Sequence, residues 1–306
     1  MEKLKSAQLM SKARTGVNKP LPESFGLLYD VVRWEEKAIL AASKKKGLQL
    51  NMIDARNLYL QVDDDGDDAA WIGSTVLQRC VSYFRSLHLT GILENKGIHV
   101  INNLSSAQTC GNKLFSTLAL RKAGIPTPRT MAAFSSGSAF KALDNLQYPA
   151  VLKPVMGSWG RLVAPLNDPE SATAIIEDRE QMSSLYQIYY IQKRVNRPPR
   201  DIRSFVIGDQ FVTAIYRYSA PKEWRTNTAR GGKAEPCPRT KELEELSLRA
   251  AKAVGGEIIG VDCMETPEGL VVHEVNNTIE FKNTVPVTGV DIPGIIVGYM
   301  LNSAKK

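Results

Sequence analysis

The chain has 306 residues, of which 43% are hydrophobic and 23% charged, the ordinary composition of a globular protein with two or three substructures. Its formal net charge is +7, no run approaches the roughly 18 apolar residues of a membrane span, and no apolar secretion segment opens the chain. The four cysteines and three histidines are scattered, which argues against a disulfide framework and a zinc cluster. We therefore expect a reduced, cytoplasmic protein that does not bind membranes.

The positive charge is concentrated at the start of the chain, where residues 1–20 contribute +4 and leave only +3 for the rest. We interpret residues 1–24 as a basic flexible tail. Because no RNA motif and no DNA-reading element is recognisable, we do not expect a nucleic-acid partner.

From residue 25 onwards, strand-like and helix-like patterns alternate, which predicts an α/β (α+β) protein. The expected strands cover residues 25–29, 48–54, 76–82, 98–102, 130–134, 150–153, 162–165, 189–195, 202–207, 211–218, 257–265 and 270–276. The expected helices cover residues 33–46, 105–123, 138–146, 169–182, 241–254 and 292–303, and one more lies between the third and fourth strands. Lys113 falls inside one of these helices, where an ordinary solvated lysine is expected.

The last two expected strands form a hairpin that brings oxygen ligands together. With its turn near Pro267 and Glu268, Asp262 lies opposite Glu274, and Asn276 shares a face with Glu274. Two carboxylates and an amide suit Mg²⁺, which completes its octahedron with water and phosphate oxygens. A solvent-facing acidic pair on an edge hairpin is the alternative.

A glycine loop follows the expected strand 150–153. Lys153 ends the strand, and the loop contains Gly157, Ser158, Trp159 and Gly160. Glycines permit close approach of the backbone to phosphate, and the lysine adds a positive charge. The spacing is not that of a Walker A motif, and an ordinary turn is the alternative.

Other polar segments are compatible with a binding site. Asn227 and Arg230 lie in a polar loop that could hold a phosphoryl or carboxylate group, although a mobile surface loop is equally compatible. Asp201 and Arg203 share a strand face and could form a surface ion pair. Residues 276–283 could line a polar pocket, with a capped turn as the alternative.

The order of these pieces resembles the ATP-grasp superfamily, and within it the RimK-like branch and its LysX-type ligases. The similar segments are GSWGRL, PPRDIRSF, TNTARGG, HEVNNTIEFKN and TGVDIPG, and the resemblance covers about residues 25–303. It implies an N-terminal Rossmann-like pre-ATP-grasp domain (25–112), a central lid domain (113–195) and a C-terminal ATP-grasp domain (196–306).

The resemblance also implies a reaction that uses ATP and Mg²⁺, with two ions expected. ATP would phosphorylate the side-chain carboxylate of the C-terminal glutamate of a small acidic LysW-like carrier protein. The α-amino group of L-2-aminoadipate would then attack the acyl phosphate, a step of lysine biosynthesis. Use of L-glutamate, as in arginine biosynthesis, use of both amino acids, or addition of glutamate to a protein tail are the alternatives. We expect a homo-oligomer, either a dimer or a tetramer.

Residue roles follow from the same resemblance. Lys113 and Lys153 would bind the ATP phosphates under the cover of Gly157, Ser158, Trp159 and Gly160, while Gln192, Lys193, Arg194 and Val195 would contact adenine and ribose. The catalytic group would comprise Arg203 and Asn227, near the phosphates, and Arg230, near a carboxylate. Asp262, Glu274 and Asn276 would hold Mg²⁺, and Arg230, Asn276, Thr278, Glu280, Phe281, Lys282 and Asn283 would form the substrate pocket. Lys193 and Arg194 stand where the family usually has an acidic and an aromatic residue.

Overall fold

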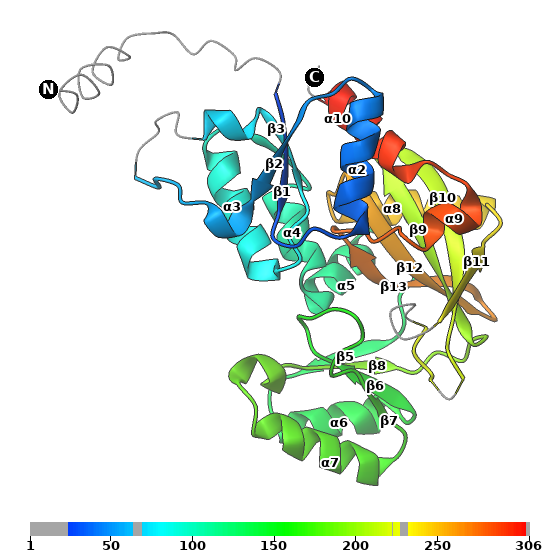
Figure 1. Ribbon diagram of the computed structural model, residues 1–306. Helices are drawn as coiled ribbons and strands as arrows, with labels where there is room; N and C mark the ends of the chain where they lie inside the picture. Colours follow the sequence, from blue (N-terminus) through cyan, green and yellow to red (C-terminus); the bar gives the residue numbers. More distant parts are fainter. Residues whose placement is uncertain (1–23, 64–68, 222, 227–231, 304–306) are drawn as a thin grey trace, which may run out of the picture.

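The computed structural model describes residues 24–63, 69–221, 223–226 and 232–303, and these form three β-sheets with helices packed against them (Figure 1). In Figure 1 the sheet nearest the N-terminus lies at the upper left, the C-terminal sheet at the right and the central sheet at the bottom. The expected α/β class is confirmed. The interpretation of residues 1–24 as a tail falls almost entirely outside the described residues.

The first sheet is parallel, with strand order β2-β1-β3-β4. Its elements are β1 (Phe25–Tyr29), α2 (Trp34–Lys45), β2 (Leu50–Asp54), β3 (Thr75–Gln78), α3 (Tyr83–Asn95) and β4 (His99–Ile101). Parallel strands end at the same edge of a sheet, so the segments that follow β1, β3 and β4 lie together. These segments contain Arg33, Arg79 and Asn102 and face the C-terminal sheet.

The expected helix over residues 105–123 is two helices, α4 (Leu104–Cys110) and α5 (Lys113–Lys122). The Asn112 side chain accepts hydrogen bonds from the backbone N–H groups of Leu114 and Phe115, which fixes the start of α5. Lys113 is therefore the first residue of a helix, and the expectation of a mid-helix, solvated lysine was wrong.

The central sheet has the order β5-β8-β6-β7 and its own core. Its elements are β5 (Thr130–Ala133), α6 (Ser136–Leu146), β6 (Ala150–Lys153), β7 (Ala164–Leu166), α7 (Pro169–Glu180) and β8 (Tyr189–Lys193). Apolar residues of α6 and α7, such as Leu143 and Ile176, pack against Leu152 and Ile191. This lobe is joined to the rest of the molecule by the segments before β5 and after β8 (Figure 1).

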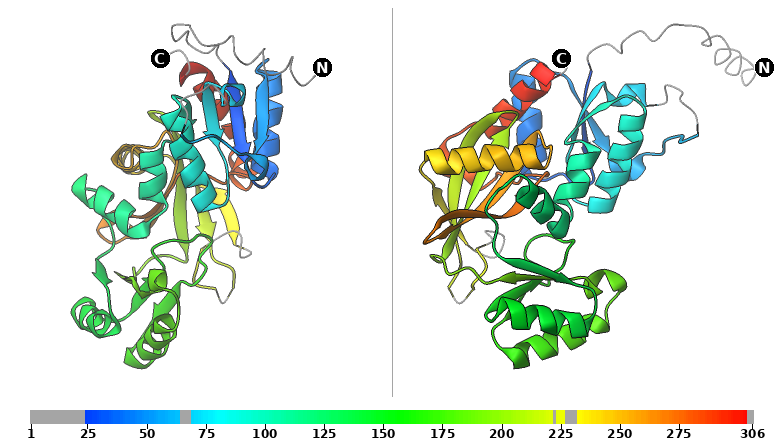
Figure 2. Two further views of the ribbon diagram at one scale, coloured as in Figure 1. Left: turned by 90° about the vertical axis from the view of Figure 1, so that its left-hand side faces the viewer. Right: turned by 180° about the vertical axis from the view of Figure 1, so that it is seen from behind.

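The C-terminal sheet is antiparallel, with order β11-β10-β9-β12-β13. Its elements are β9 (Arg200–Ile207), β10 (Gln210–Tyr218), β11 (Lys233–Pro236), α8 (Lys241–Ala253), β12 (Ile258–Thr266) and β13 (Gly269–Asn276), followed by α9 (Thr284–Thr288) and α10 (Ile292–Ser303). The right-hand view of Figure 2 shows α8 across one face of this sheet. The short elements β11 and α9 were not expected from the sequence.

The opposite face of the C-terminal sheet shares a core with the first sheet. Alternation along β9 places Val206 on the α8 side and Phe205 on the other side. There Phe205 belongs to one cluster with Phe25 and Ile39 of the first sheet and its helix α2, and with Met300 of α10. The first and last elements of the described chain are thus packed together.

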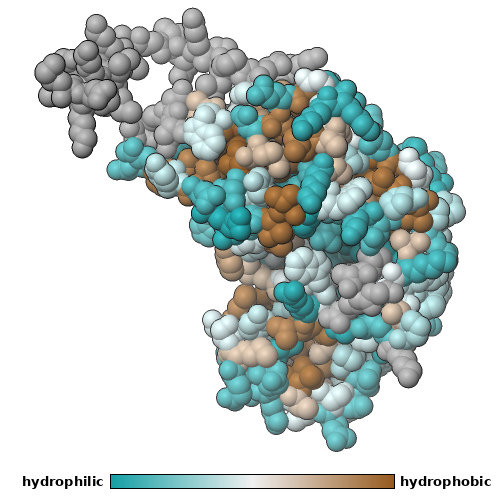
Figure 3. All heavy atoms as spheres, in the orientation of Figure 1, coloured by the Kyte–Doolittle hydropathy of each residue, from teal (hydrophilic) through white to brown (hydrophobic). Residues whose placement is uncertain are grey.

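Among the helices of the described residues, none is long and apolar enough to cross a membrane. On the face shown in Figure 3, hydrophobic residues form separate patches among hydrophilic ones.

Candidate active site

A cavity of about 1250 Å³ lies where the three sheets meet. Most of the residues that the sequence singled out line it. They are Lys113, Lys153, Gly157, Ser158, Trp159, Gly160, Gln192, Lys193, Arg194, Val195, Arg203, Asp262, Glu274, Asn276, Thr278, Glu280, Lys282 and Asn283. Phe281 does not line the cavity, and Asn227 and Arg230 lie outside the described residues.

The two predicted metal-binding carboxylates lie opposite each other. Asp262 of β12 pairs in register with Glu274 of β13, and Asn276 pairs with Gly260, which confirms the predicted hairpin. Asp262 also pairs in register with Arg203 of β9, and a guanidinium N–H of Arg203 lies 2.6 Å from Asp262 Oδ2.

The predicted surface ion pair between Asp201 and Arg203 is wrong. Asp201 is buried and accepts two hydrogen bonds, of 2.7 and 2.8 Å, from Arg217 on β10. Arg217 reaches Asp262 Oδ2 as well, at 3.0 Å, so Asp262 lies between two guanidinium groups. Asp201 and Arg203 of β9 are therefore each neutralised by a residue of a neighbouring strand. All four residues, Asp201, Arg203, Arg217 and Asp262, line the cavity.

Lys113 connects the carboxylate side of the cavity with the glycine loop. Its Nζ lies 3.2 Å from Glu274 Oε1 and donates a hydrogen bond of 2.7 Å to the carbonyl oxygen of Gly157. Burial alone would raise the pKa of Glu274, but the positive charges of Lys113 and Lys153 contribute to holding it at about 2. Glu274 is therefore a carboxylate at neutral pH, as a cation ligand must be.

Lys153 ends β6 and projects into the cavity. Its Nζ donates to Gln192 Oε1 at 2.7 Å, and the amide nitrogen of Gln192 donates to Thr130 Oγ1 and to the Tyr190 hydroxyl, both at 3.1 Å. Burial lowers the pKa of Lys153 to about 8. An anionic ligand next to this amine would restore its positive charge.

The glycine loop is held against the cavity from several sides. Trp159 has a φ of 58° and Gly160 a φ of 63°, so the loop turns through the left-handed region. The carbonyl oxygen of Gly160 accepts a hydrogen bond from Arg225, and Trp159 Nε1 donates to Glu280 Oε1 at 3.2 Å. Together with the contact of Lys113 to Gly157, these bonds hold the loop where its residues 157–160 line the cavity.

Lys193 and Arg194, the two residues that depart from the family pattern, form polar contacts within the protein. Lys193 Nζ donates to the carbonyl oxygens of Gln147 and Tyr148, both at 3.0 Å. Arg194 donates to Asn167 Oδ1 at 3.3 Å, and its guanidinium lies 5.6 Å from the centre of the Trp224 ring. An acidic or aromatic residue would not make the Lys193 contacts.

Segment 277–283, which follows β13, forms part of the cavity wall and contacts the glycine loop through Glu280 and Trp159. Thr278, Glu280, Lys282 and Asn283 line the cavity. The Phe281 side chain is fully buried and meets the Trp34 ring edge-to-face, with 5.9 Å between the ring centres.

Sequence reasoning missed cavity residues that belong to other parts of the chain. They are Arg33, Trp34 and Glu35 at the start of α2, Tyr83 of α3, Arg217 of β10 and His273 of β13. Among the described atoms, neither ring nitrogen of His273 has a hydrogen-bond partner, and burial lowers the pKa of this imidazole. Its place beside Glu274 in the sequence was the one available signal.

The donor set fits a magnesium nucleotide. Asp262 and Glu274 supply carboxylates, and Asn276 lines the same cavity, where its buried amide nitrogen has no hydrogen-bond partner among the described atoms and could donate to a phosphate oxygen. Lys113, Lys153 and Arg203 surround these groups with positive charge that a phosphate chain can use.

Comparison with known proteins agrees with this geometry. The RimK-like ATP-grasp domain family matches residues 110–300, and the LysX pre-ATP-grasp domain family matches residues 25–109. An alpha-aminoadipate–LysW ligase LysX of Sulfurisphaera tokodaii is 38% identical, with 92% of this chain and 99% of the relative covered. A glutamate–LysW ligase ArgX of Sulfolobus acidocaldarius is 34% identical over 90% of this chain and 98% of the relative.

Solved structures show the same fold at lower sequence similarity. The crystal structure of a RimK domain ATP-grasp protein from Sphaerobacter thermophilus superposes with a TM-score of 0.74 at 23% identity, covering 91% of this chain and 99% of that one. A D-alanine–D-alanine ligase from Bacillus anthracis, complexed with ATP, gives a TM-score of 0.65 over 93% of this chain and 96% of that one, at 20% identity. The expected ATP-grasp fold is thereby confirmed, and the chain belongs to the RimK-like ATP-grasp family of ATP-dependent ligases.

Proposed function

We propose that this ligase joins the α-amino group of L-2-aminoadipate to the side-chain carboxylate of the C-terminal glutamate of a small acidic LysW-type carrier protein. The observation that carries the proposal is a single cavity that combines phosphate-binding lysines, a carboxylate pair with an asparagine, and the polar segment 277–283. The relatives named as aminoadipate ligases support this substrate, because three of them are 37–39% identical, whereas two named as glutamate ligases are 33–34% identical.

Different residues would bind the nucleotide and stabilise the transferring phosphoryl group. Lys113 and Lys153 hold the phosphate chain of ATP beneath the glycine loop, which excludes water from the acyl phosphate. Arg203 stabilises the charge that develops as the γ-phosphoryl group moves to the carrier carboxylate and ADP leaves. The amine of the amino acid then attacks the carbonyl carbon, phosphate departs, and the amine loses a proton as the amide forms.

Asp262, Glu274 and Asn276 are the residues that would hold Mg²⁺, and we propose two ions. When bound, Mg²⁺ neutralises the phosphate oxygens and polarises the transferring group. The lysines and Arg203 carry the remaining charge.

We also propose the division into three domains, 25–112, 113–195 and 196–306. What supports it is the sheet topology, since β1–β4, β5–β8 and β9–β13 form one sheet each. The glycine loop then belongs to the central domain and the carboxylates to the C-terminal domain.

Asn227 and Arg230 lie outside the described residues, so their proposed roles rest on the family resemblance. If Arg230 binds a carboxylate of the amino acid or the carrier, Arg230→Ala should lower ligation far more than nucleotide binding. Initial rates with each substrate varied, together with titration of ADP, measure the two effects separately. Equal losses in both would place Arg230 at the nucleotide instead.

ADP binding is expected to take up a proton at pH 8.5. The pKa of Lys153 is lowered to about 8 in the free protein, so much of this amine is neutral at pH 8.5, and a bound phosphate favours its charged form. Calorimetric titration of ADP with Mg²⁺ in buffers of different ionisation enthalpy gives the number of protons. Lys153→Met should abolish the uptake, whereas the exposed Lys141→Met should retain it.

The proposed function is tested by intact-protein mass spectrometry of a LysW-type carrier that ends in glutamate. The carrier is incubated with this protein, ATP and Mg²⁺, and L-2-aminoadipate and L-glutamate are offered separately and in competition. A mass gain that matches aminoadipate supports the proposal. A glutamate adduct in the competing reaction would replace aminoadipate with glutamate, and an unmodified carrier would overturn the proposed acceptor.

A further inference from the structure

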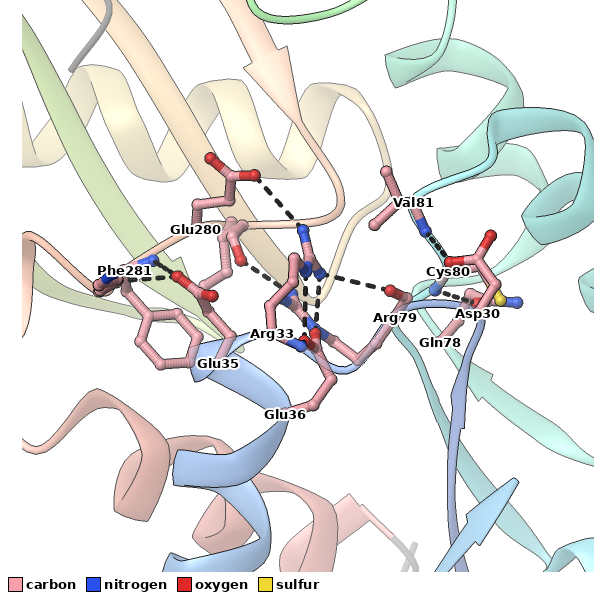
Figure 4. A network of polar contacts seen from close by, with 12 residues as sticks. Asp30, Arg33, Glu35, Glu36, Gln78, Arg79, Cys80, Val81, Glu280 and Phe281 are labelled. Carbon is pink, nitrogen blue, oxygen red and sulfur yellow. Dashed lines mark hydrogen bonds and ion pairs between the residues drawn. The ribbon is translucent and has the colours of Figure 1, made fainter. Parts of the chain in front are cut away.

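The backbone of segment 277–283 is held by side chains from the first sheet and its helix. The Asn102 amide donates to the carbonyl oxygen of Asn277 at 2.7 Å, and Arg79 donates to that of Ile279 at 2.8 Å. Glu35 Oε1 accepts from the backbone N–H groups of Phe281 and Lys282, at 3.1 and 3.0 Å. Figure 4 shows Glu35 and Arg79 reaching this segment from one side.

These three side chains are almost completely buried. Glu35 is 4% exposed, and Arg79 and Asn102 are each 3% exposed. Segment 277–283 lies between β13 and α9 and is neither strand nor helix, so its backbone groups need partners from elsewhere. Removing such a partner leaves buried N–H or C=O groups unsatisfied, which costs more than the hydrogen bond itself contributes.

The same contacts lead to the glycine loop. Arg79 Nε lies 3.0 Å from Glu36 Oε1, and Glu36 receives a second guanidinium from Arg33, with Nη2 to Oε1 at 2.8 Å. Arg33 also reaches Glu280 Oε1 at 3.4 Å, and this oxygen accepts the indole N–H of Trp159. A continuous set of polar contacts therefore runs from Arg79 through Glu36 and Arg33 to Glu280, as Figure 4 shows. The indole N–H of Trp159 extends it to the glycine loop.

We infer that Glu35, Arg79 and Asn102 are positioning residues of the ligation site. They fix the backbone of segment 277–283, and through it they place Thr278, Glu280 and Lys282 at the cavity. The amino acid that the enzyme accepts is then determined partly by residues of α2 and of the segments after β3 and β4, which act through segment 277–283. The inference rests on the proposed function for the identity of the substrate. The positioning of segment 277–283 does not depend on which amino acid is used.

Glu35 offers the cleanest test, because a glutamine there keeps an oxygen that can accept both N–H groups. Glu35→Ala removes the acceptor, whereas Glu35→Gln retains it and removes only the charge. His99→Ala is the matched control. It breaks another polar contact between the same two sheets, His99 Nε2 to Glu257 Oε1 at 3.2 Å, without touching segment 277–283.

The first readout is hydrogen exchange of peptides that cover residues 277–283, measured by mass spectrometry on the full chain. Glu35→Ala should speed exchange of the Phe281 and Lys282 amides at least tenfold, on the order expected when a buried bond is lost. Glu35→Gln and His99→Ala should stay within about threefold of the wild type. Equal exchange in Glu35→Ala and the wild type would overturn the inference, whether or not the proposed substrate is right.

The second readout compares the kinetic constants for the amino acid with the affinity for ADP. Glu35→Ala should raise the KM for the amino acid at least tenfold and change the ratio of kcat/KM for aminoadipate over glutamate, with the affinity for ADP within about twofold of the wild type. Glu35→Gln should restore the KM. A glutamine variant as impaired as the alanine variant would mean that the carboxylate acts by its charge and not through the segment. If the wild type modifies no carrier at all, the proposed function fails while the exchange result still stands.

Discussion

Glu274→Gln is expected to lower the rate of ADP formation on the order of 10²- to 10³-fold, the effect of removing one stabilising group from a transition state. The glutamine has nearly the same shape, but it lacks the negative charge of Glu274. That charge would bind the magnesium of the nucleotide, and it pairs with Lys113. Asp262→Asn is less suitable, because it would also leave Arg203 and Arg217 without their shared carboxylate. The measurement is coupled-assay detection of ADP with the carrier and amino acid present.

The control is Glu265→Gln on β12, three residues from Asp262. Glu265 pairs with Arg200 and does not line the cavity. We expect its variant to retain at least half of the wild-type rate. Comparable turnover in Glu274→Gln and the wild type would remove Glu274 from the metal assignment.

Phe205→Ala is expected to lower the free energy of unfolding by about 3–5 kcal/mol, as for other fully buried phenylalanines. Phe205 has no exposed surface and lies in the core that the C-terminal sheet shares with β1, α2 and α10. Its loss leaves a cavity where three parts of the chain meet. Chemical denaturation followed by tryptophan fluorescence measures the change.

Phe134→Ala provides the matched comparison, because this residue, directly after β5, is 70% exposed. It should change the free energy of unfolding by less than about 0.5 kcal/mol. An equal loss in the free energy of unfolding for both variants would show that the shared core does not contribute the expected stability.

Elements with strong local patterns could be predicted from the sequence. The strands 25–29 and 150–153 and the helix 292–303 have the predicted bounds, because apolar runs between turn residues leave few alternatives. The strand β11 was missed because its four residues have no apolar pattern and pair only with β10. Its formation depends on the partner strand, which the local sequence does not show.

The polar contacts of the site follow a similar division. The opposition of Asp262 and Glu274 could be predicted to within one residue from the short turn between their strands; an irregularity between Asp262 and Cys263 then moves the partner of Asp262 from His273 to Glu274. The partners of Asp201 and Arg203 could not, because they lie on strands whose neighbours in the sheet are set by long-range topology. Lys113 was misplaced because the cap formed by Asn112 was not recognised.

The packing of α10 on the first elements has a consequence for synthesis on the ribosome. Phe25, Leu27 and Ile39 are made early, but the residues that complete their core, Ile296 and Met300, are among the last. About 260 peptide bonds separate the two, which at about 5–20 residues per second leaves an apolar surface uncovered for tens of seconds. The nascent chain is therefore expected to need chaperone protection on its first sheet until the C-terminal helix emerges, and chains truncated before α10 should aggregate.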